Sequence, residues 1–224
     1  MNFSKSPGGK TALVLGASGL VGTLLTGQLL QSPEYDRVVL LVRRPLDLRH
    51  PKLTQEITDF DRPDPARVEG DDVFCCLGTT IKAAGSREAF YRVDSTYPYE
   101  IGRLARHNGA AQYLLVTAMG ADPGSSVFYN RVKGETEQRI DSLGFPTFCI
   151  FRPSLLLGDR REFRLGERLA QGLSAVVAPL MIGGLKKYRP VEARQVAAAM
   201  RAVANLGLEG KHVFESDRLA AHGQ

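Results

Sequence analysis

A tyrosine and a lysine four residues apart, Tyr129 and Lys133, are the side chains of this sequence best suited to acid–base chemistry. On a helix, this spacing places both side chains on one face. A free tyrosine has a pKa of about 10, which is too high for easy proton exchange at neutral pH. A nearby ammonium favours the phenolate and lowers that pKa, so the pair predicts a general acid or base for a carbonyl or an alcohol.

A hydroxyl group twelve residues upstream, on Thr117, completes the candidate catalytic group. Thr117 ends an apolar run that predicts a strand, and ligands of parallel α/β folds gather at that end of the sheet. Its hydroxyl can hold the substrate oxygen that Tyr129 protonates. Ser125 and Ser126, in the loop just ahead of the helix, remain alternatives for this role.

Three glycines at a strand-to-helix junction, Gly16, Gly19 and Gly22, predict an anion site. The apolar run 13–15 precedes them, and a helical pattern begins near residue 20. Free backbone N–H groups and the helix dipole converge at such a junction, which suits a pyrophosphate. A glycine-rich turn without a ligand is the alternative. We expect a dinucleotide to bind here, through Gly16, Ser18, Gly19, Leu20, Val21 and Gly22.

Two arginines after the next predicted strand, Arg43 and Arg44, favour NADP(H) over NAD(H). In such folds an acidic residue about 20 residues beyond the glycines binds the ribose 2′-hydroxyl of NAD, whereas an arginine accommodates the 2′-phosphate of NADP. The first carboxylate after these arginines is Asp47. A guanidinium forms a charge-assisted pair with a phosphate, which a carboxylate would repel. A solvated basic turn is the alternative.

Further residues near predicted strand ends complete the expected cofactor site. Asp59 is a candidate for binding the adenine amine, and Lys133 can hydrogen-bond the nicotinamide ribose. The remaining candidates are Leu77, Gly78 and Thr79, which are expected to pass beneath the cofactor, and Arg152, Pro153 and Ser154. No histidine has the spacing of a metal ligand, and three cysteines argue against a disulfide framework, so we expect no metal.

The elements that must position these residues alternate along the chain. Strands are expected at 13–15, 38–42, 54–59, 72–76, 113–117, 147–152 and 212–215. Helices are expected from about residue 20 and at 87–107, 128–142 and 191–206. This alternation implies right-handed crossovers and a doubly wound parallel sheet, an α/β Rossmann architecture. One domain is expected over 10–216, with 154–190 as a small C-terminal, substrate-side elaboration and 1–9 and 217–224 as flexible tails.

Composition and charge favour a protein that acts on a small molecule. The 224 residues carry a formal net charge of +5, and 43% of them are hydrophobic. The arginines are spread along the chain, whereas nucleic-acid binding would need a basic patch, so we expect no nucleic-acid partner. No apolar run reaches the roughly 18 to 20 residues of a membrane span, and the N-terminus lacks the apolar core of a signal peptide. We therefore expect no integral membrane segment and a cytoplasmic location, and we leave a homodimer open.

Four longer motifs make the chain similar to a known family. They are CCLGTT at 75–80, GAD at 120–122, FYNRVKGETE at 128–137 and FRPSLLLGDRREFRLGE at 151–167. With them, the chain resembles the atypical short-chain dehydrogenases/reductases over about 11–213, and within that superfamily the group that contains the HIV-1 Tat-interactive protein. The resemblance implies a Rossmann domain that binds NADPH through the glycine loop and the paired arginines. It also implies a Thr/Ser–Tyr–Lys constellation, carried by Thr117, Tyr129 and Lys133.

The chain also departs from the superfamily pattern. The upstream hydroxyl is often a serine there, whereas here it is Thr117, followed by Ala118. The asparagine that completes the catalytic tetrad of many members has no clear match, since Asp94 on the corresponding helix is not an equivalent group. The C-terminal part is short, which argues against nucleotide-sugar chemistry. These features favour an NADPH-dependent reductase of a small carbonyl compound, with a non-catalytic, NADPH-sensing binding protein as the alternative.

Overall fold

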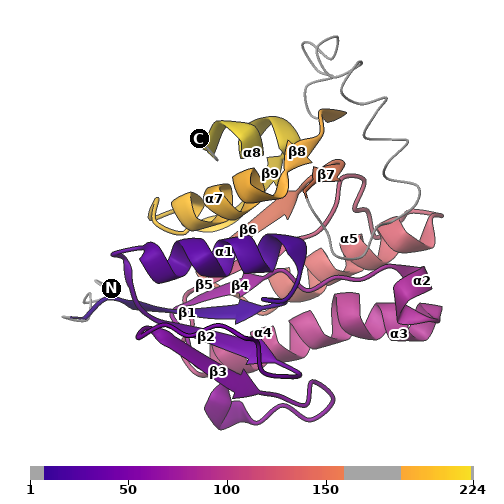
Figure 1. The fold of residues 1–224 in the computed structure, drawn as a ribbon. Helices are drawn as coiled ribbons and strands as arrows, with labels where there is room; N and C mark the ends of the chain where they lie inside the picture. Colours follow the sequence, from indigo (N-terminus) through magenta and orange to yellow (C-terminus); the bar gives the residue numbers. More distant parts are fainter. Residues whose placement is uncertain (1–7, 159–187, 223–224) are drawn as a thin grey trace.

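Seven strands form one parallel sheet in the computed structural model, which describes residues 8–158 and 188–222 (Figure 1). The strands are β1 (Lys10–Leu15), β2 (Tyr35–Val42), β3 (Leu53–Ile57), β4 (Asp72–Cys75), β5 (Gln112–Val116), β6 (Thr147–Arg152) and β9 (Gly210–Glu215). Their order in the sheet is β3-β2-β1-β4-β5-β6-β9. The order reverses between β1 and β4, and ligands of such sheets bind outside the carboxyl ends of the strands at this point. The predicted doubly wound sheet is confirmed.

Successive residues of each strand face two different helical layers. One layer holds α1 (Leu20–Gln31), α7 (Ala193–Val203) and α8 (Ser216–His222), and the other holds α4 (Tyr97–His107) and α5 (Phe128–Asp141) (Figure 1). Val14 packs into the core on the α1 and α7 side, whereas its neighbour Leu13 packs into the core on the α4 and α5 side. Side chains alternate across a strand, so the apolar runs of the central strands bury both faces.

The single helix expected at 87–107 is divided by a π-helical turn. It consists of α3 (Arg87–Tyr91), the π turn η2 (Arg92–Thr96) and α4. The Thr136 hydroxyl on α5 lies 3.0 Å from the carbonyl oxygen of Asp94 and 2.7 Å from that of Val132 on its own helix, so the two acceptors share its one proton. A side chain that inserts into a helical hydrogen-bond ladder in this way distorts the helix locally. Two further short helices are η1 (Pro65–Arg67) and α2 (Ile81–Ala84).

The C-terminal side differs from the expectation in two places. A strand β7 (Leu156–Leu157) pairs in parallel with β8 (Val191–Glu192), although the sequence around them shows no strand alternation. The segment from 217, expected as a flexible tail, belongs to α8, which buries Leu219 against the core. Two-residue strands carry too little periodicity to be recognised, and α8 is held by tertiary burial. Most of the 154–190 elaboration lies outside the described residues.

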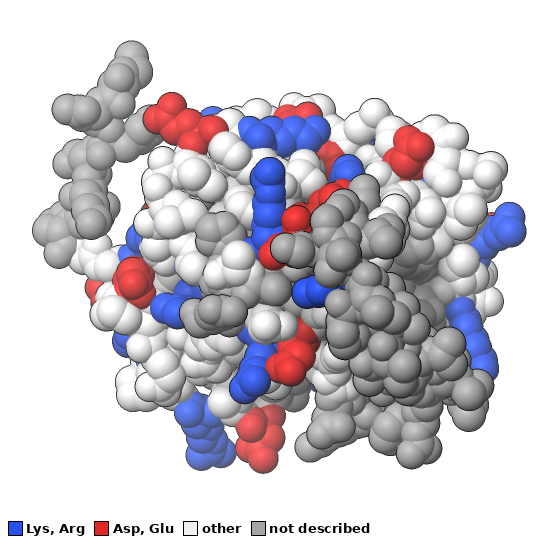
Figure 2. All heavy atoms as spheres, turned by 90° about the horizontal axis from the view of Figure 1, so that it is seen from above, with Lys and Arg blue, Asp and Glu red and all other residues white. Residues whose placement is uncertain are grey.

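The described surface carries charges of both signs. From the direction shown in Figure 2, basic and acidic side chains interleave, without an extended patch of one sign outside the grey residues. None of the helices within 8–158 and 188–222 combines the length and the apolar character that crossing a membrane requires. The same residues hold no cluster of three or more histidines, cysteines or carboxylates that could bind a metal ion.

Candidate active site

The turn between β1 and α1 has no space for side chains at two of its glycines. Gly16 has a φ of +78°, and a Cβ there would lie 2.6 Å from the carbonyl carbon of Cys76, just beyond β4. A Cβ on Gly22 would lie 2.1 Å from the carbonyl oxygen of Gly16. Gly19 caps α1 without any side-chain hydrogen bond to its first turn. The turn therefore leaves backbone N–H groups for an anion, in the arrangement that a pyrophosphate fills.

The other residues predicted around this turn differ in their exposure. Ser18 is exposed at the turn, Leu20 is half-buried at the start of α1, and Val21 is buried beneath the helix. The buried side chain of Val21 thus cannot contact a ligand, and only its backbone can.

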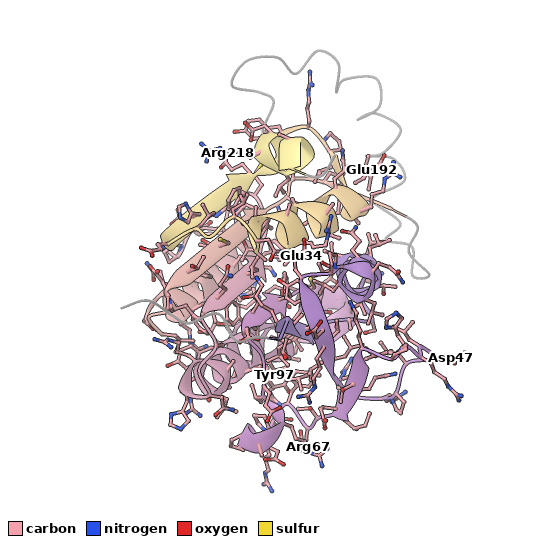
Figure 3. The ribbon with its side chains drawn as sticks, turned by 90° about the vertical axis from the view of Figure 1, so that its left-hand side faces the viewer. Glu34, Asp47, Arg67, Tyr97, Glu192 and Arg218 are labelled. Carbon is pink, nitrogen blue, oxygen red and sulfur yellow. The ribbon has the colours of Figure 1, made fainter. Side chains whose placement is uncertain are left out.

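The two arginines predicted to bind a phosphate follow β2 directly and are exposed. Within 8–158 and 188–222, neither Arg43 nor Arg44 forms an ion pair, so both guanidinium groups are available. Asp47 lies on the projecting loop beyond β2 and points outward (Figure 3). Asp59 lies two residues beyond β3, where its Oδ1 accepts a hydrogen bond of 3.0 Å from the backbone N–H of Asp61.

The loop after β4 is tied to the π turn by one carboxylate. The backbone N–H of Thr79 donates to Asp94 Oδ2 across 2.9 Å. A Cβ on Gly78 would lie 3.5 Å from both Asp94 Oδ1 and Lys133 Nζ, so the loop passes directly over this pair. Leu77 packs on the core beneath. The segment 77–79 therefore connects β4 to the Asp94–Lys133 pair.

Lys133 is buried and paired with a carboxylate that the sequence did not assign to it. Its Nζ lies 2.7 Å from Asp94 Oδ1, and neither side chain is more than 6% exposed. Burial lowers the pKa of Lys133, but the attraction of Asp94 and Tyr129 outweighs burial, so the pKa is raised. The same Nζ lies 5.9 Å from the ring centre of Tyr129, whose ring packs against Phe90. The predicted Tyr129–Lys133 juxtaposition on one face of α5 is therefore present.

Thr117 lies at the end of β5, as predicted, but its hydroxyl already has a buried partner. Thr117 Oγ1 donates to Glu137 Oε1 across 2.7 Å. The Arg152 guanidinium binds the same carboxylate through two nitrogen atoms, Nε at 2.9 Å and Nη2. The hydrogen bond to Glu137 is the largest cause of the raised pKa of Arg152. Because an ionised carboxylate only accepts, the hydroxyl proton of Thr117 is directed at Glu137.

The two alternative hydroxyls lie in the loop before α5. Ser125 Oγ accepts a hydrogen bond of 3.1 Å from the backbone N–H of Val127, and its carbonyl accepts another from Arg131. Ser126 is exposed. Neither contacts Tyr129 in the described hydrogen bonds, so the role of these serines stays a prediction.

The residues after β6 are held by structural hydrogen bonds. The carbonyl of Pro153 accepts a hydrogen bond of 2.9 Å from the backbone N–H of Met119. The backbone N–H of Ser154 donates to Ser216 Oγ on α8 across 2.8 Å, and the Ser154 hydroxyl donates to the carbonyl of Arg189. Their assignment to the cofactor site stays a prediction.

Two acidic residues that matter for this site were not predicted. Asp94 shares a helix face with Phe90 and Ile101, and a carboxylate on a buried face requires a cation. Glu137 continues the four-residue spacing of Tyr129 and Lys133 along α5. Both signals are present in the sequence, but only the fold shows which partner each carboxylate has.

Comparison with known proteins places this architecture in a family. The chain is 40% identical over 169 residues to the protein HTATIP2 of Rattus norvegicus. The matched region covers 72% of this chain and 69% of that protein. It is also 31% identical over 211 residues to the protein FMP52, mitochondrial, of Candida albicans, and this match covers 90% of each chain. The chain is an atypical short-chain dehydrogenase/reductase. No family model matches it.

Solved structures agree with this short-chain dehydrogenase/reductase fold. MoeE5 in complex with UDP-glucuronic acid and NAD has a TM-score of 0.70 at 14% identity and covers 92% of this chain and 76% of its own. The UDP-glucose 4-epimerase of Thermotoga maritima with UDP-glucose has a TM-score of 0.67 at 15% identity and covers 93% and 77%. At such low identity these likenesses establish the nucleotide-binding Rossmann fold alone.

One expectation about this short-chain dehydrogenase/reductase is wrong. The lack of a recognisable targeting signal suggested a cytoplasmic location. The fungal relatives from Candida albicans, Aspergillus niger and Candida glabrata are all named as mitochondrial proteins. A cytoplasmic location therefore does not follow by default for this family, because targeting information need not take the form of an apolar signal peptide.

Proposed function

We propose that the protein is an NADP(H)-dependent oxidoreductase that interconverts a carbonyl and an alcohol on a small molecule. The observation that carries the proposal is the buried Lys133 ammonium, 5.9 Å from the Tyr129 ring, at the carboxyl edge of the sheet. A tyrosine beside a buried cation is suited to exchange a proton with a substrate oxygen. Family membership and the NAD named with several solved neighbours support a nicotinamide cofactor.

The residues around the glycine turn suit such a cofactor. The glycine turn would hold the pyrophosphate, since Cβ atoms at Gly16 and Gly22 would collide with the turn's own backbone or with the segment just after β4. Arg43 and Arg44, exposed and without ion pairs in the described chain, would bind the 2′-phosphate. Lys133 would hydrogen-bond the nicotinamide ribose. When bound, the cofactor supplies or accepts the hydride.

The protein's own residues move the proton. Tyr129 gives its phenolic proton to the carbonyl oxygen during reduction and takes it back during oxidation. Lys133 favours the phenolate form electrostatically. Thr117 is proposed to accept a hydrogen bond from the O–H of the alcohol, through the lone pairs that its bond to Glu137 leaves free.

Loss of NADPH absorbance with a panel of aldehydes, ketones and quinones tests the proposal. We expect turnover with at least one compound, and a loss of about 10²- to 10⁴-fold in Tyr129→Phe, the usual contribution of a general acid or base. Tyr99→Phe is the matched control, because Tyr99 lies on α4 and its ring contact with Arg139 survives the change. Turnover that is unaffected by Tyr129→Phe would contradict the assignment.

A second candidate is a cofactor-sensing binding protein. The observation that favours it is the Thr117 proton, which is directed at Glu137 and so cannot be donated to a carbonyl beside Tyr129. Such a protein would bind NADPH, and Tyr129→Phe would leave its function intact. Pull-downs with and without NADPH decide the matter, since partner recovery that ignores the cofactor would eliminate this candidate.

A further inference from the structure

The Asp94–Lys133 pair is a direct contact between two buried charges. Nζ and Oδ1 are 2.7 Å apart, the Asp94 side chain is fully buried and that of Lys133 is 6% exposed. The second oxygen of Asp94 accepts the Thr79 N–H, and the main chain of Asp94 is held by Thr136. Asp94 is therefore held by three contacts. If Lys133 moved away, the buried carboxylate of Asp94 would be left without a cation, which is strongly destabilising.

We propose that Asp94 is a positioning residue that holds Lys133 over the β4 loop and offsets most of the positive charge that the lysine presents to Tyr129. This inference rests on the proposed function, because it concerns the same proton transfer. In a site where a neutral residue faced the lysine, the full positive charge of the lysine would act on the tyrosine.

The charges around the lysine support the sign of this effect. The groups that face Lys133 are Asp94 from η2, Tyr129 from its own helix and the Cys75 thiol from β4. Tyr129 itself faces Lys133 and the uncharged ring of Phe90. Asp94 is thus the one carboxylate of the described chain in contact with this cation. Removing its charge makes the surroundings of Tyr129 more positive and favours the phenolate.

Asp94→Asn tests the proposal with two readouts. Tyrosinate absorbance is titrated in the wild type and in Asp94→Asn, each after subtraction of its own Tyr129→Phe variant, so that only Tyr129 contributes. We expect the phenolate to appear about one pH unit lower in Asp94→Asn, the size of effect expected of one charge at this range in a partly screened site. The pH–rate profile of alcohol oxidation should move in the same direction.

Asp141→Asn is the matched control. Asp141 lies on the same helix as Lys133 and also contacts a lysine, Lys211, at 2.8 Å, but both side chains are exposed. It lies about 18 Å along the helix from Tyr129, beyond the screening length of about 10 Å at 0.1 M salt. We expect no shift in this variant. An equal shift in both variants, or none in Asp94→Asn, would overturn the proposal.

A double variant covers the case in which Asp94→Asn does not fold. Asp94→Leu/Lys133→Met removes both charges together and leaves no buried charge without a partner, which proteins tolerate far better than loss of one. If Asp94 offsets the lysine, Tyr129 ionises at nearly the wild-type pH in this variant. A rise of about one pH unit or more would show that the lysine acts on Tyr129 without compensation. The absorbance readout needs no turnover, so it separates this proposal from the proposed function.

Discussion

Thr117 and Glu137 meet across 2.7 Å, where the hydroxyl at the end of β5 donates to a buried carboxylate on α5. Arg152 at the end of β6 binds both oxygens of the same carboxylate. One acidic side chain therefore fastens two neighbouring strands to the helix that carries the tyrosine and the lysine. It also determines that Thr117 faces a ligand as a hydrogen-bond acceptor.

Glu137→Ala should destabilise the fold by about 3 kcal/mol, because it leaves the Arg152 charge and the Thr117 hydroxyl without their partner. The value lies at the low end for a broken buried pair because Arg152 is 25% exposed. Urea denaturation measures the change. Glu135→Ala on the same helix is the control, since its contact with Arg131 is long, at 3.9 Å, and only half-buried. It should cost less than about 1 kcal/mol. Equal losses in both variants would mean that the Glu137 cluster adds nothing.

Stability at high pH should report the Lys133 pair. Burial lowers the pKa of Lys133, and the larger opposing effect of Asp94 and Tyr129 raises it above the ordinary value of 10.5. A cation with a raised pKa in the folded state contributes stability that is complete below the unfolded value and is lost as pH rises through the folded one. The contribution should therefore disappear only above about pH 10.5.

Denaturant titrations between pH 8 and pH 11.5 test this window by difference. The free energy of unfolding of the wild type should fall more steeply above pH 10.5 than that of Asp94→Leu/Lys133→Met, which has no such pair. Subtracting the two removes the contribution of the other lysines and tyrosines. Parallel curves throughout would mean that the pair is not linked to stability.

Arg43→Ala/Arg44→Ala should weaken NADPH binding while leaving NADH binding nearly unchanged. Charge-assisted hydrogen bonds contribute about 1.5 to 3 kcal/mol each, so a ten- to hundredfold preference for NADPH is expected in the wild type. Calorimetric titration of both cofactors measures it. Arg49→Ala, at an exposed arginine of the same loop, should retain the preference. Equal affinity of the wild type for NADPH and NADH would leave the two arginines as a basic surface turn.

Gly22→Ala should abolish cofactor binding and destabilise the fold, because its Cβ would lie 2.1 Å from the Gly16 carbonyl oxygen. Gly27→Ala on the same helix is the control. A Cβ there meets no atom within 4 Å, and alanine is favoured over glycine in a helix by about 1 kcal/mol. Thermal denaturation with and without NADPH measures both effects. Gly22→Ala should lower the melting temperature and remove the stabilisation by NADPH, whereas Gly27→Ala should raise the melting temperature and keep that stabilisation. A Gly22→Ala protein that binds NADPH normally would contradict the assigned turn.

The sheet could be predicted because its central strands are apolar runs that lie between glycine-containing turns. The ends of the strands were missed where residues without an apolar side chain continue the pairing. Lys10 does so in β1, and Gly210 does so in β9. Backbone hydrogen bonds extend strands beyond the residues that bury their side chains, and hydrophobic patterning does not report them.

The candidate site was predictable only as far as local spacing reaches. Tyr129 and Lys133 lie four residues apart on one helix, and their proximity follows from helix geometry. The partner of Lys133 does not, because Asp94 lies in a π turn that is distant in the sequence and that contacts Thr136 of α5 through the main chain. A hydrogen bond between side chains and main chain far apart in sequence has no local signature.

The π turn Arg92–Thr96 makes the helix sensitive to chain length in a way that substitutions do not reveal. Each α-helical residue turns the chain by about 100°. A π turn takes up one residue more than an α turn, so a one-residue deletion that restored a regular helix would leave α3 and α4 nearly in their present register. Phe90 and Ile101 would keep their places in the core, whereas the turn that carries Asp94 to Lys133 would be lost. A single-residue deletion in this stretch should therefore give a folded protein that lacks the buried pair.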